Sequence, residues 1–231
     1  MNALDKSLRA IAEEFSPAVL AHSLQAEDMV LTDVIARAGL PIELFVLDTG
    51  RLHADSLYLI EKIRRQYGID VRVYAPDADA VSEYVRRHGR DAFYGSVELR
   101  KRCCEIRKVE PLARALAGKR AWITGQRRAQ ASSRAKLAER EFDATHRLEK
   151  FNPLAAWTET DVWDYIRKQR VPYNRLYDQG YRSIGCAPCT RPVMPGEDLR
   201  AGRWWWDEAG QKECGLHITP DGRVVRTKET A

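Results

Sequence analysis

Short apolar runs alternate with helical patterns through the first two thirds of the chain, and this alternation constrains the fold most strongly. The apolar runs cover Ala18–Ala21, Ile42–Leu47 and Val71–Tyr74, and helical patterns follow Asp28 and occupy about Ala54–Tyr67. A β-α-β-α-β order predicts a parallel sheet flanked by helices, with ligands bound at the carboxyl ends of the strands. With 231 residues, the chain has room for one α/β domain and a short appendage.

Polar turns follow three of the predicted strands. They comprise residues 23–28, residues 48–51 and the turn at Gly125, which follows an apolar run over 121–124. The free N–H groups of helix N-termini at such places bind phosphate or sulfate. Simple capping of the following helix, by Asp28 for example, explains any single turn equally well. The three turns together favour an anion-binding edge of the sheet.

Five cysteines fall into an adjacent pair, a Cys-x-x-Cys pair and a single residue near the end. Because neighbouring thiolates can each take a different iron atom, the two pairs favour a polynuclear iron–sulfur cluster. A single zinc ion would need both neighbours at tetrahedral angles, and ordinary core packing is the plainer alternative. The odd count argues against a disulfide framework. The predicted metal ligands are Cys103, Cys104, Cys186 and Cys189, which leaves Cys214 over.

Cys214 is the candidate nucleophile. Lys212 and His217 would stabilise a thiolate and lower its pKa from the usual value of about 8.5, whereas Glu213 would act the other way. A cysteine without a role explains this local sequence equally well. Attack by a thiolate on a sulfate or phosphate group brings negative charges together, at a cost of about 4 kcal/mol for each unit pair about 4 Å apart. Cations beside the reacting group are therefore required.

Basic residues are concentrated between Arg100 and Lys136, where twelve Lys or Arg side chains stand against two acids. Such a segment forms a solvated helical face, a nucleic-acid patch or the wall of a site for a small polyanion. The basic residues are interleaved with the cysteine pair and with the Gly125 turn, and no nucleic-acid module accompanies them, so we favour the third reading. The candidate neutralising side chains are Lys108, Arg200 and Arg203.

The sequence also carries information on location and on domain organisation. Residues 1–15 contain acids and no apolar core, so we expect no signal peptide, and no apolar run approaches the length of a membrane span. Thiols outside a disulfide framework suit a reducing compartment, which predicts a cytoplasmic protein. Thr158 and Asp161, at the start of an amphipathic segment, predict a capping box.

Many glycines and prolines interrupt the final forty or so residues and predict a mobile C-terminal tail. We expect a nucleotide-binding and iron–sulfur α/β domain over residues 1–195 and a tail over residues 196–231 that carries the catalytic cysteine. Neither nucleic acid nor membrane is an expected partner, and a homo-oligomer stays open.

Seven segments, spread over nearly the whole chain, match one known family in their order. They are AEDMVL (26–31), LDTGRLH (47–53), KRCCEIRKVEPL (101–112), TGQRRAQ (124–130), GCAPCTRPV (185–193), EDLRAGRWWW (197–206) and KECGLH (212–217). In these segments the chain resembles the assimilatory adenylyl-sulfate (APS) reductases, the cluster-containing branch of the phosphoadenylyl-sulfate reductase family. The first loop departs from the family pattern at His22 and Leu24, where smaller or aromatic residues are expected.

The resemblance implies a fold like that of the adenine-nucleotide α-hydrolases and a [4Fe-4S] cluster held by the four paired cysteines. The first loop lacks the glycines with which ATP-cleaving relatives grip pyrophosphate, which implies a fit to the smaller phosphosulfate group. A packing role is favoured for the three tryptophans at 204–206. The implied substrate-binding residues are Ser23, Gln25, Thr49, Gly50, Arg51, Lys108, Gly125, Arg127, Arg134, Arg200, Arg203 and His217.

The reaction that the resemblance implies is the reduction of adenosine 5'-phosphosulfate in assimilatory sulfate reduction. Cys214 attacks the sulfur atom, AMP leaves, and thioredoxin or glutaredoxin releases sulfite from the resulting S-sulfonate. Three alternatives stay open. They are a reductase of the 3'-phosphorylated nucleotide, against which the cysteine quartet counts, a non-catalytic metal-bearing nucleotide-binding module, and a tRNA-thiolating enzyme, which would need the missing glycines.

Overall fold

Six strands form one sheet in the computed structural model, which describes residues 3–207. Their order across the sheet is β3-β2-β1-β4-β6-β5, and every neighbouring pair is parallel except β5 and β6. The strands are β1 (Ala18–Ala21), β2 (Ile42–Leu47), β3 (Val71–Tyr74), β4 (Ala121–Ile123), β5 (Arg140–Asp143) and β6 (Leu148–Phe151). The predicted parallel sheet is confirmed, with an antiparallel strand added at one edge.

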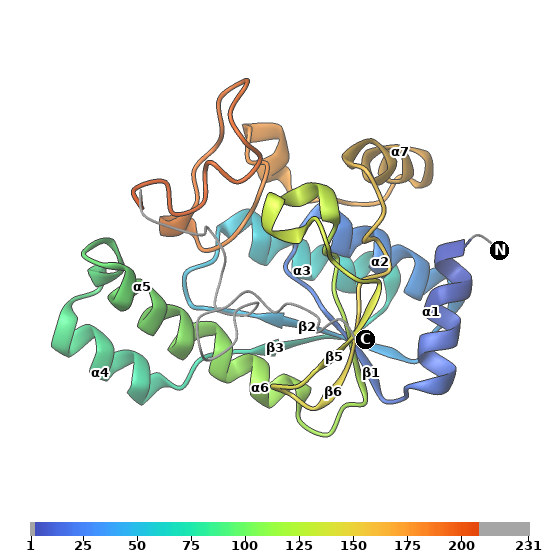
Figure 1. Ribbon diagram of the computed structural model, residues 1–231, viewed down its shortest axis with the longest axis horizontal. Helices are drawn as coiled ribbons and strands as arrows, with labels where there is room; N and C mark the ends of the chain where they lie inside the picture. Colours follow the sequence, from blue (N-terminus) through green and yellow to red (C-terminus); the bar gives the residue numbers. More distant parts are fainter. Residues whose placement is uncertain (1–2, 208–231) are drawn as a thin grey trace.

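Helices cover both faces of this sheet. Figure 1 shows α1, α2, α3 and α7 on one side and the run from α4 to α6 on the other. The α-helices are α1 (Ala3–Glu14), α2 (Ala26–Ala38), α3 (Ala54–Tyr67), α4 (Ala78–His88), α5 (Val97–Cys104), α6 (Glu110–Leu116) and α7 (Glu159–Gln169). A π-helical turn, Glu105–Val109, joins α5 directly to α6. Across residues 3–207, no helix combines the length and the apolar character needed to cross a bilayer.

Hydrophobic side chains form one core on each face of the sheet. Ala18 and Leu20 of β1 belong to the larger core, under α1, α2, α3 and α7. Val19 belongs to the smaller core, where it packs with Phe45, Trp122 and residues of α6. This alternation follows from the strand itself, because successive side chains point to opposite faces. The two cores hold the strands in register, so the loops after β1, β2 and β4 meet at one edge of the sheet.

Local sequence signals explain where the helices that border this edge begin and end. In α2, residues 26–35 are all buried, and the helix stops at Gly39, which adopts a left-handed φ of 60° that suits glycine. At the start of α7, the Thr158 hydroxyl accepts from the Asp161 N–H (3.1 Å) and the Asp161 carboxylate accepts from the Thr158 N–H (2.8 Å). The predicted capping box is therefore confirmed.

The described part of the predicted tail, residues 196–207, packs against the segment that carries the second cysteine pair. The Trp204 N–H donates to the Cys189 carbonyl (3.1 Å), and the Arg191 N–H donates to the Gly202 carbonyl (3.0 Å). A boundary at residue 195 stays a prediction. Residues 208–231, with Cys214 among them, lie outside the described part of the chain.

Candidate active site

The main cavity of the described residues, about 190 Å³ in volume, lies at the carboxyl ends of β1, β2 and β4. Each of the three predicted ligand turns contributes to its wall, through Ser23, Thr49 and Gly125. Later segments close it from the other side, notably residues 182–185 and 199–203. Parallel strands end at the same edge of a sheet, so turns far apart in the sequence share one site.

An internal carboxylate organises the first loop of this cavity. Asp28 accepts hydrogen bonds from the Ser23 N–H (2.7 Å) and the Ser23 hydroxyl (2.5 Å). The Gln25 side-chain oxygen accepts from the Ile184 N–H (3.1 Å). Gly125 packs so closely on Asp28 that a Cβ atom there would overlap its carboxylate. Ser23, Gln25 and Gly125 therefore line the cavity as expected, but their contacts in this structure are internal, and their binding role stays a prediction.

Burial raises the pKa of Asp28 from 3.8 to about 6, although hydrogen bonds from Ser23, Gln25 and Gly125 lower it. The folded chain thus holds this proton more tightly than the unfolded chain does. The resulting contribution to stability is complete below the unfolded pKa of 3.8 and is lost as the pH rises through about 6. At neutral pH the protein keeps a buried carboxylate beside its main cavity.

An Asp28→Asn variant is expected to remove this pH dependence. Between about pH 4 and about pH 7, the free energy of unfolding of the wild-type protein should fall by about 2 kcal/mol more than that of the variant. Urea unfolding of both proteins across this range measures the difference. A gap between the two curves that does not change with pH would contradict the raised pKa.

His22 is a wall residue that the sequence marks only as a departure from the family pattern. Its Nδ1 accepts a hydrogen bond from the Leu24 N–H (3.0 Å), and burial lowers its pKa to about 3. The ring is therefore neutral and carries its proton on Nε2, a buried nitrogen with no hydrogen-bond partner in the described part of the chain. Leu24 has a left-handed φ of 64°, a conformation that costs a non-glycine residue about 1–3 kcal/mol.

The basic residues expected to bind the substrate occupy two places. The main cavity is lined by Lys108, Arg127, Arg134, Arg200 and Arg203. Arg127 also forms a buried ion pair with Glu27 (2.8 Å). Arg51 lines a second cavity and pairs with Asp91 (2.6 Å), and Gly50 precedes it in a left-handed turn at φ 68°. The structure thus places Arg51 and Gly50 apart from the main cavity wall, and their predicted contact with substrate is untested.

The four predicted metal ligands meet at this second, smaller cavity. Cys103 and Cys104 form the end of α5, and Cys186 and Cys189 flank and end the short helix Ala187–Cys189. Among residues 3–207 none of these four cysteines forms a disulfide bond, and all four line the same cavity. Lys108 lines this cavity as well as the main one. One cation therefore stands between the cysteine quartet and the candidate substrate site.

The donor set of the second cavity fits an iron–sulfur cluster. Burial raises the pKa of Cys189 to about 12 and also raises that of Cys103, so thiolates here need a metal or another positive charge. Trp204 lines the same cavity, and its buried Nε1–H has no acceptor among residues 3–207, where the sulfur atoms of a cluster would provide one. Within residues 3–207, no three His, Cys, Asp or Glu side chains are arranged around a single metal ion. The adjacent thiols of Cys103 and Cys104 can each take a different iron atom of one cluster.

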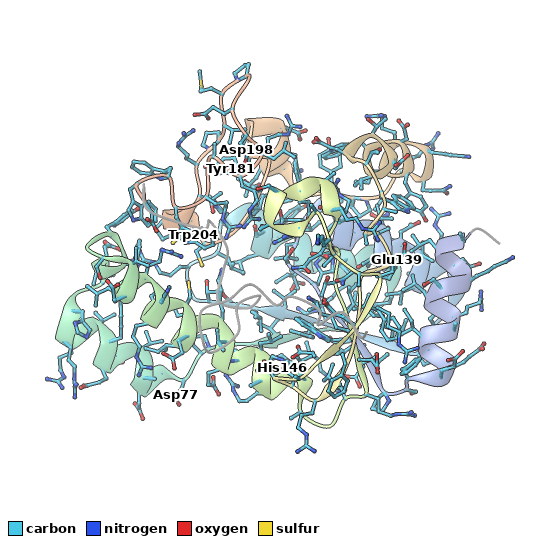
Figure 2. All side chains as sticks on the ribbon, in the orientation of Figure 1. Asp77, Glu139, His146, Tyr181, Asp198 and Trp204 are labelled. Atoms are coloured by element: carbon cyan, nitrogen blue, oxygen red, sulfur yellow. The ribbon has the colours of Figure 1, made fainter. Side chains whose placement is uncertain are left out.

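Arg203 connects the two cavities. Its guanidinium lines the main cavity, donates to the Ile184 carbonyl (2.9 Å) and lies 4.7 Å from the ring centre of Trp204. Figure 2 shows Trp204 on the segment that passes over α5, where Arg100 approaches the same ring to 4.8 Å. A Cβ atom on Gly185 would stand 2.5–3.0 Å from three atoms of the Arg203 guanidinium. The glycine before the second cysteine pair therefore leaves the space that Arg203 occupies.

The remaining predicted residues are only partly accounted for. The predicted nucleophile Cys214 and its neighbour His217 lie outside the described residues. Trp204 is buried, with 1% of its surface exposed, and Trp206 packs edge-on against Tyr94 with ring centres 4.3 Å apart. These contacts agree with the packing role favoured for Trp204 and Trp206, whereas Trp205 is 48% exposed.

Known proteins are similar to this chain in sequence and in fold. The chain is 57% identical to the adenosine 5'-phosphosulfate reductase of Allochromatium vinosum, over 91% of this chain and 82% of that protein. It is 56% identical to the protein of the same name from Burkholderia cepacia, over 94% of this chain and 86% of that protein.

Solved structures agree on the fold. A phosphate complex of phosphoadenylyl-sulfate reductase from Candida auris superposes with a TM-score of 0.71 at 28% identity, covering 83% of this chain and 91% of that one. An ATP complex of Candida glabrata FMN adenylyltransferase, with a TM-score of 0.56 at 15% identity over 84% of this chain and 65% of that one, shares the fold alone. The family model of the phosphoadenosine phosphosulfate reductase domain matches residues 17–192. The chain belongs to the phosphoadenosine phosphosulfate reductase family.

Proposed function

We propose that this protein reduces adenosine 5'-phosphosulfate to sulfite and AMP in sulfate assimilation. The observation that carries the proposal is the position of Lys108, which lines both the main cavity and the cavity of the four cysteines. The relatives from Allochromatium vinosum and Burkholderia cepacia, both named adenosine 5'-phosphosulfate reductase, support the choice of substrate.

The chemistry uses the fifth cysteine as nucleophile. The Cys214 thiolate forms a bond to the sulfur of the phosphosulfate, and the bond from that sulfur to the bridging oxygen breaks with its electron pair leaving on AMP. A thiolate of the reductant then attacks the Cys214 sulfur, and sulfite leaves with the electron pair of the S–S bond. A second thiol of the reductant resolves the mixed disulfide, so the reductant loses two electrons. Thioredoxin or glutaredoxin, acting in the cytoplasm, is the reductant that we propose.

The side chains of the main cavity neutralise the substrate. Lys108, Arg200 and Arg203 line the same wall and offset the charge repulsion between a thiolate and a sulfated phosphate. Arg203 is the most constrained of them, because Gly185 and the Trp204 ring bound its guanidinium. A planar fork held in this way suits two oxygens of one tetrahedral anion. We assign these three residues to the phosphosulfate group and the loops at Ser23, Thr49 and Gly125 to the nucleoside side.

A [4Fe-4S] cluster held by Cys103, Cys104, Cys186 and Cys189 completes the proposal. When bound, the cluster would supply an electrostatic environment beside the substrate, without electron transfer. The protein's part is to hold Lys108 beside both cavities and to line the cysteine cavity with Trp204. Four cysteines at one cavity, two of them buried, and an indole N–H that has no acceptor among residues 3–207 support this assignment.

Turnover with two substrates tests the function. The purified, iron-loaded protein, thioredoxin and its reducing system should release sulfite and AMP from adenosine 5'-phosphosulfate. The 3'-phosphorylated nucleotide, the substrate named for the Candida auris structural relative, provides the competing arm. A higher kcat/KM with the 3'-phosphorylated nucleotide would reverse the substrate assignment, and no sulfite from either substrate would refute the proposal.

A Gly185→Ala variant tests the placement of Arg203. The added methyl group would displace the guanidinium, so kcat/KM should fall by about 10- to 100-fold while the iron content stays at the wild-type level. In an Arg203→Ala background the same change should cost little, because the clashing group is gone. Gly95→Ala is the matched control, since a Cβ there meets only the Ala92 carbonyl at 3.3 Å and Leu99 at 3.8 Å. An equal loss in both backgrounds would contradict the steric explanation.

A further inference from the structure

We infer that the Nε2–H of His22 is a neutral hydrogen-bond donor to an oxygen of the nucleotide bound in the main cavity. The inference rests on the proposed function, because it takes an adenine nucleotide as the ligand of this cavity. His22 is 3% exposed and belongs to the cavity wall directly after β1. Neither its sequence pattern nor its neighbours in the chain assign it a role.

The tautomer of His22 is fixed by the loop that follows it. The Leu24 N–H donates to Nδ1 at 3.0 Å, so that nitrogen carries no proton. A neutral imidazole must then carry its proton on Nε2. The opposite side of the ring is therefore a hydrogen-bond donor. The bond from the Leu24 N–H keeps the proton on Nε2 and off Nδ1.

The Nε2–H is buried and lacks a hydrogen-bond partner within the described residues 3–207. The great majority of buried donors in proteins have a hydrogen-bond acceptor, and an exception calls for a specific explanation. A ligand oxygen in the adjoining cavity satisfies this donor, and the nucleotide of the proposed reaction carries ribose and phosphoryl oxygens that accept hydrogen bonds. The unused donor of the free protein thus becomes a contact of the bound state.

Two features make a neutral donor suitable at this place. The Asp28 carboxylate already takes the hydrogen bonds of Ser23, so the loop beside His22 holds a negative charge of its own. The cations Lys108 and Arg203 supply the positive charge of the cavity. A neutral imidazole adds direction to nucleotide binding and leaves the charge balance of the cavity unchanged.

His22 also supports the loop itself, so a test must separate the two roles. His22→Asn keeps an acceptor near the Nδ1 position for the Leu24 N–H and removes the Nε2 donor. His22→Gln places a donor near the Nε2 position and removes the acceptor at Nδ1. The matched control is His146→Asn, because His146 bonds Asp143 on the β5–β6 hairpin and Figure 2 shows it well away from Tyr181 and Trp204.

Calorimetric titration of the iron-loaded variants with AMP and with adenosine measures the contact without turnover. We expect His22→Asn to weaken AMP binding by about 5- to 20-fold, and His22→Gln and His146→Asn to stay within about 3-fold of the wild type. A loss that persists with adenosine assigns the acceptor to the ribose, and a loss confined to AMP assigns it to the phosphate.

Wild-type affinity in His22→Asn, or equal losses in the Asn and Gln variants, would overturn the inference. Failure of the proposed function would look different, because the wild-type protein itself would then bind AMP weakly and release no sulfite.

Discussion

A Cys214→Ser variant is expected to lose sulfite release by more than about 10³-fold, because the reaction needs a sulfur nucleophile. A serine adduct would be a sulfate ester, which a reductant thiol cannot open at sulfur to give sulfite. The steady-state rate with adenosine 5'-phosphosulfate and thioredoxin measures the loss. The same variant should keep the wild-type iron content, because its four paired cysteines are intact. It should also keep the wild-type affinity for AMP, because the residues that line the main cavity are unchanged.

Normal turnover by Cys214→Ser would remove the nucleophile from the proposal. The result would leave the two cavities and their residues in place, and it would direct attention to the paired cysteines. Retention of AMP binding with loss of turnover would agree with a role for Cys214 in chemistry alone.

A Cys189→Ala variant is expected to lose both its iron and its activity. Loss of one of four thiolates should remove most of the iron and its visible absorption, and turnover should fall by more than about 10²-fold. The structural reason is that Cys189 lines the same cavity as Lys108, so a change there disturbs the cation that faces the substrate. Iron analysis, the visible spectrum and the rate, measured on one preparation, check this prediction.

Cys214→Ser is the matched control for this second experiment. It too removes one thiol, but it should preserve the colour and abolish the reaction, whereas Cys189→Ala should abolish both. Full iron content in Cys189→Ala would exclude this cysteine from the ligand set. Full activity without iron would show that the cluster has no part in the reaction.

The sequence predicted those parts of the fold that depend on short-range patterns. Ala18–Ala21, Ile42–Leu47 and Val71–Tyr74 are strands as expected. The first two are largely buried, and buried parallel strands are rich in apolar residues, whereas Val71–Tyr74 is an edge strand in which only Val71 is buried. The hairpin of β5 and β6 was not predicted. Its strand β5 exposes 60% of Phe142 and lies at the sheet edge, so its extended conformation depends on pairing with β6 rather than on an apolar run of its own.

The candidate site, too, was predictable from the sequence only in part. The two cysteine pairs were predicted as one ligand set from spacing alone, and the structure brings them to one cavity. The contacts of Arg127 could not be predicted from the sequence, because its partner Glu27 lies 100 positions away and only the sheet order brings the two loops together. His22 shows the limit most clearly. Its Nε2–H has no partner among residues 3–207 because of a local loop conformation that no residue pattern specifies.

The most direct test of the central claim is intact-protein mass spectrometry after anaerobic incubation with adenosine 5'-phosphosulfate and no reductant, followed by peptide mapping. We predict a single sulfonate on Cys214, with AMP released in equal amount, and complete removal of the adduct by thioredoxin. A sulfonate on any other residue, or no adduct when the substrate has been shown to bind, would contradict the proposed mechanism.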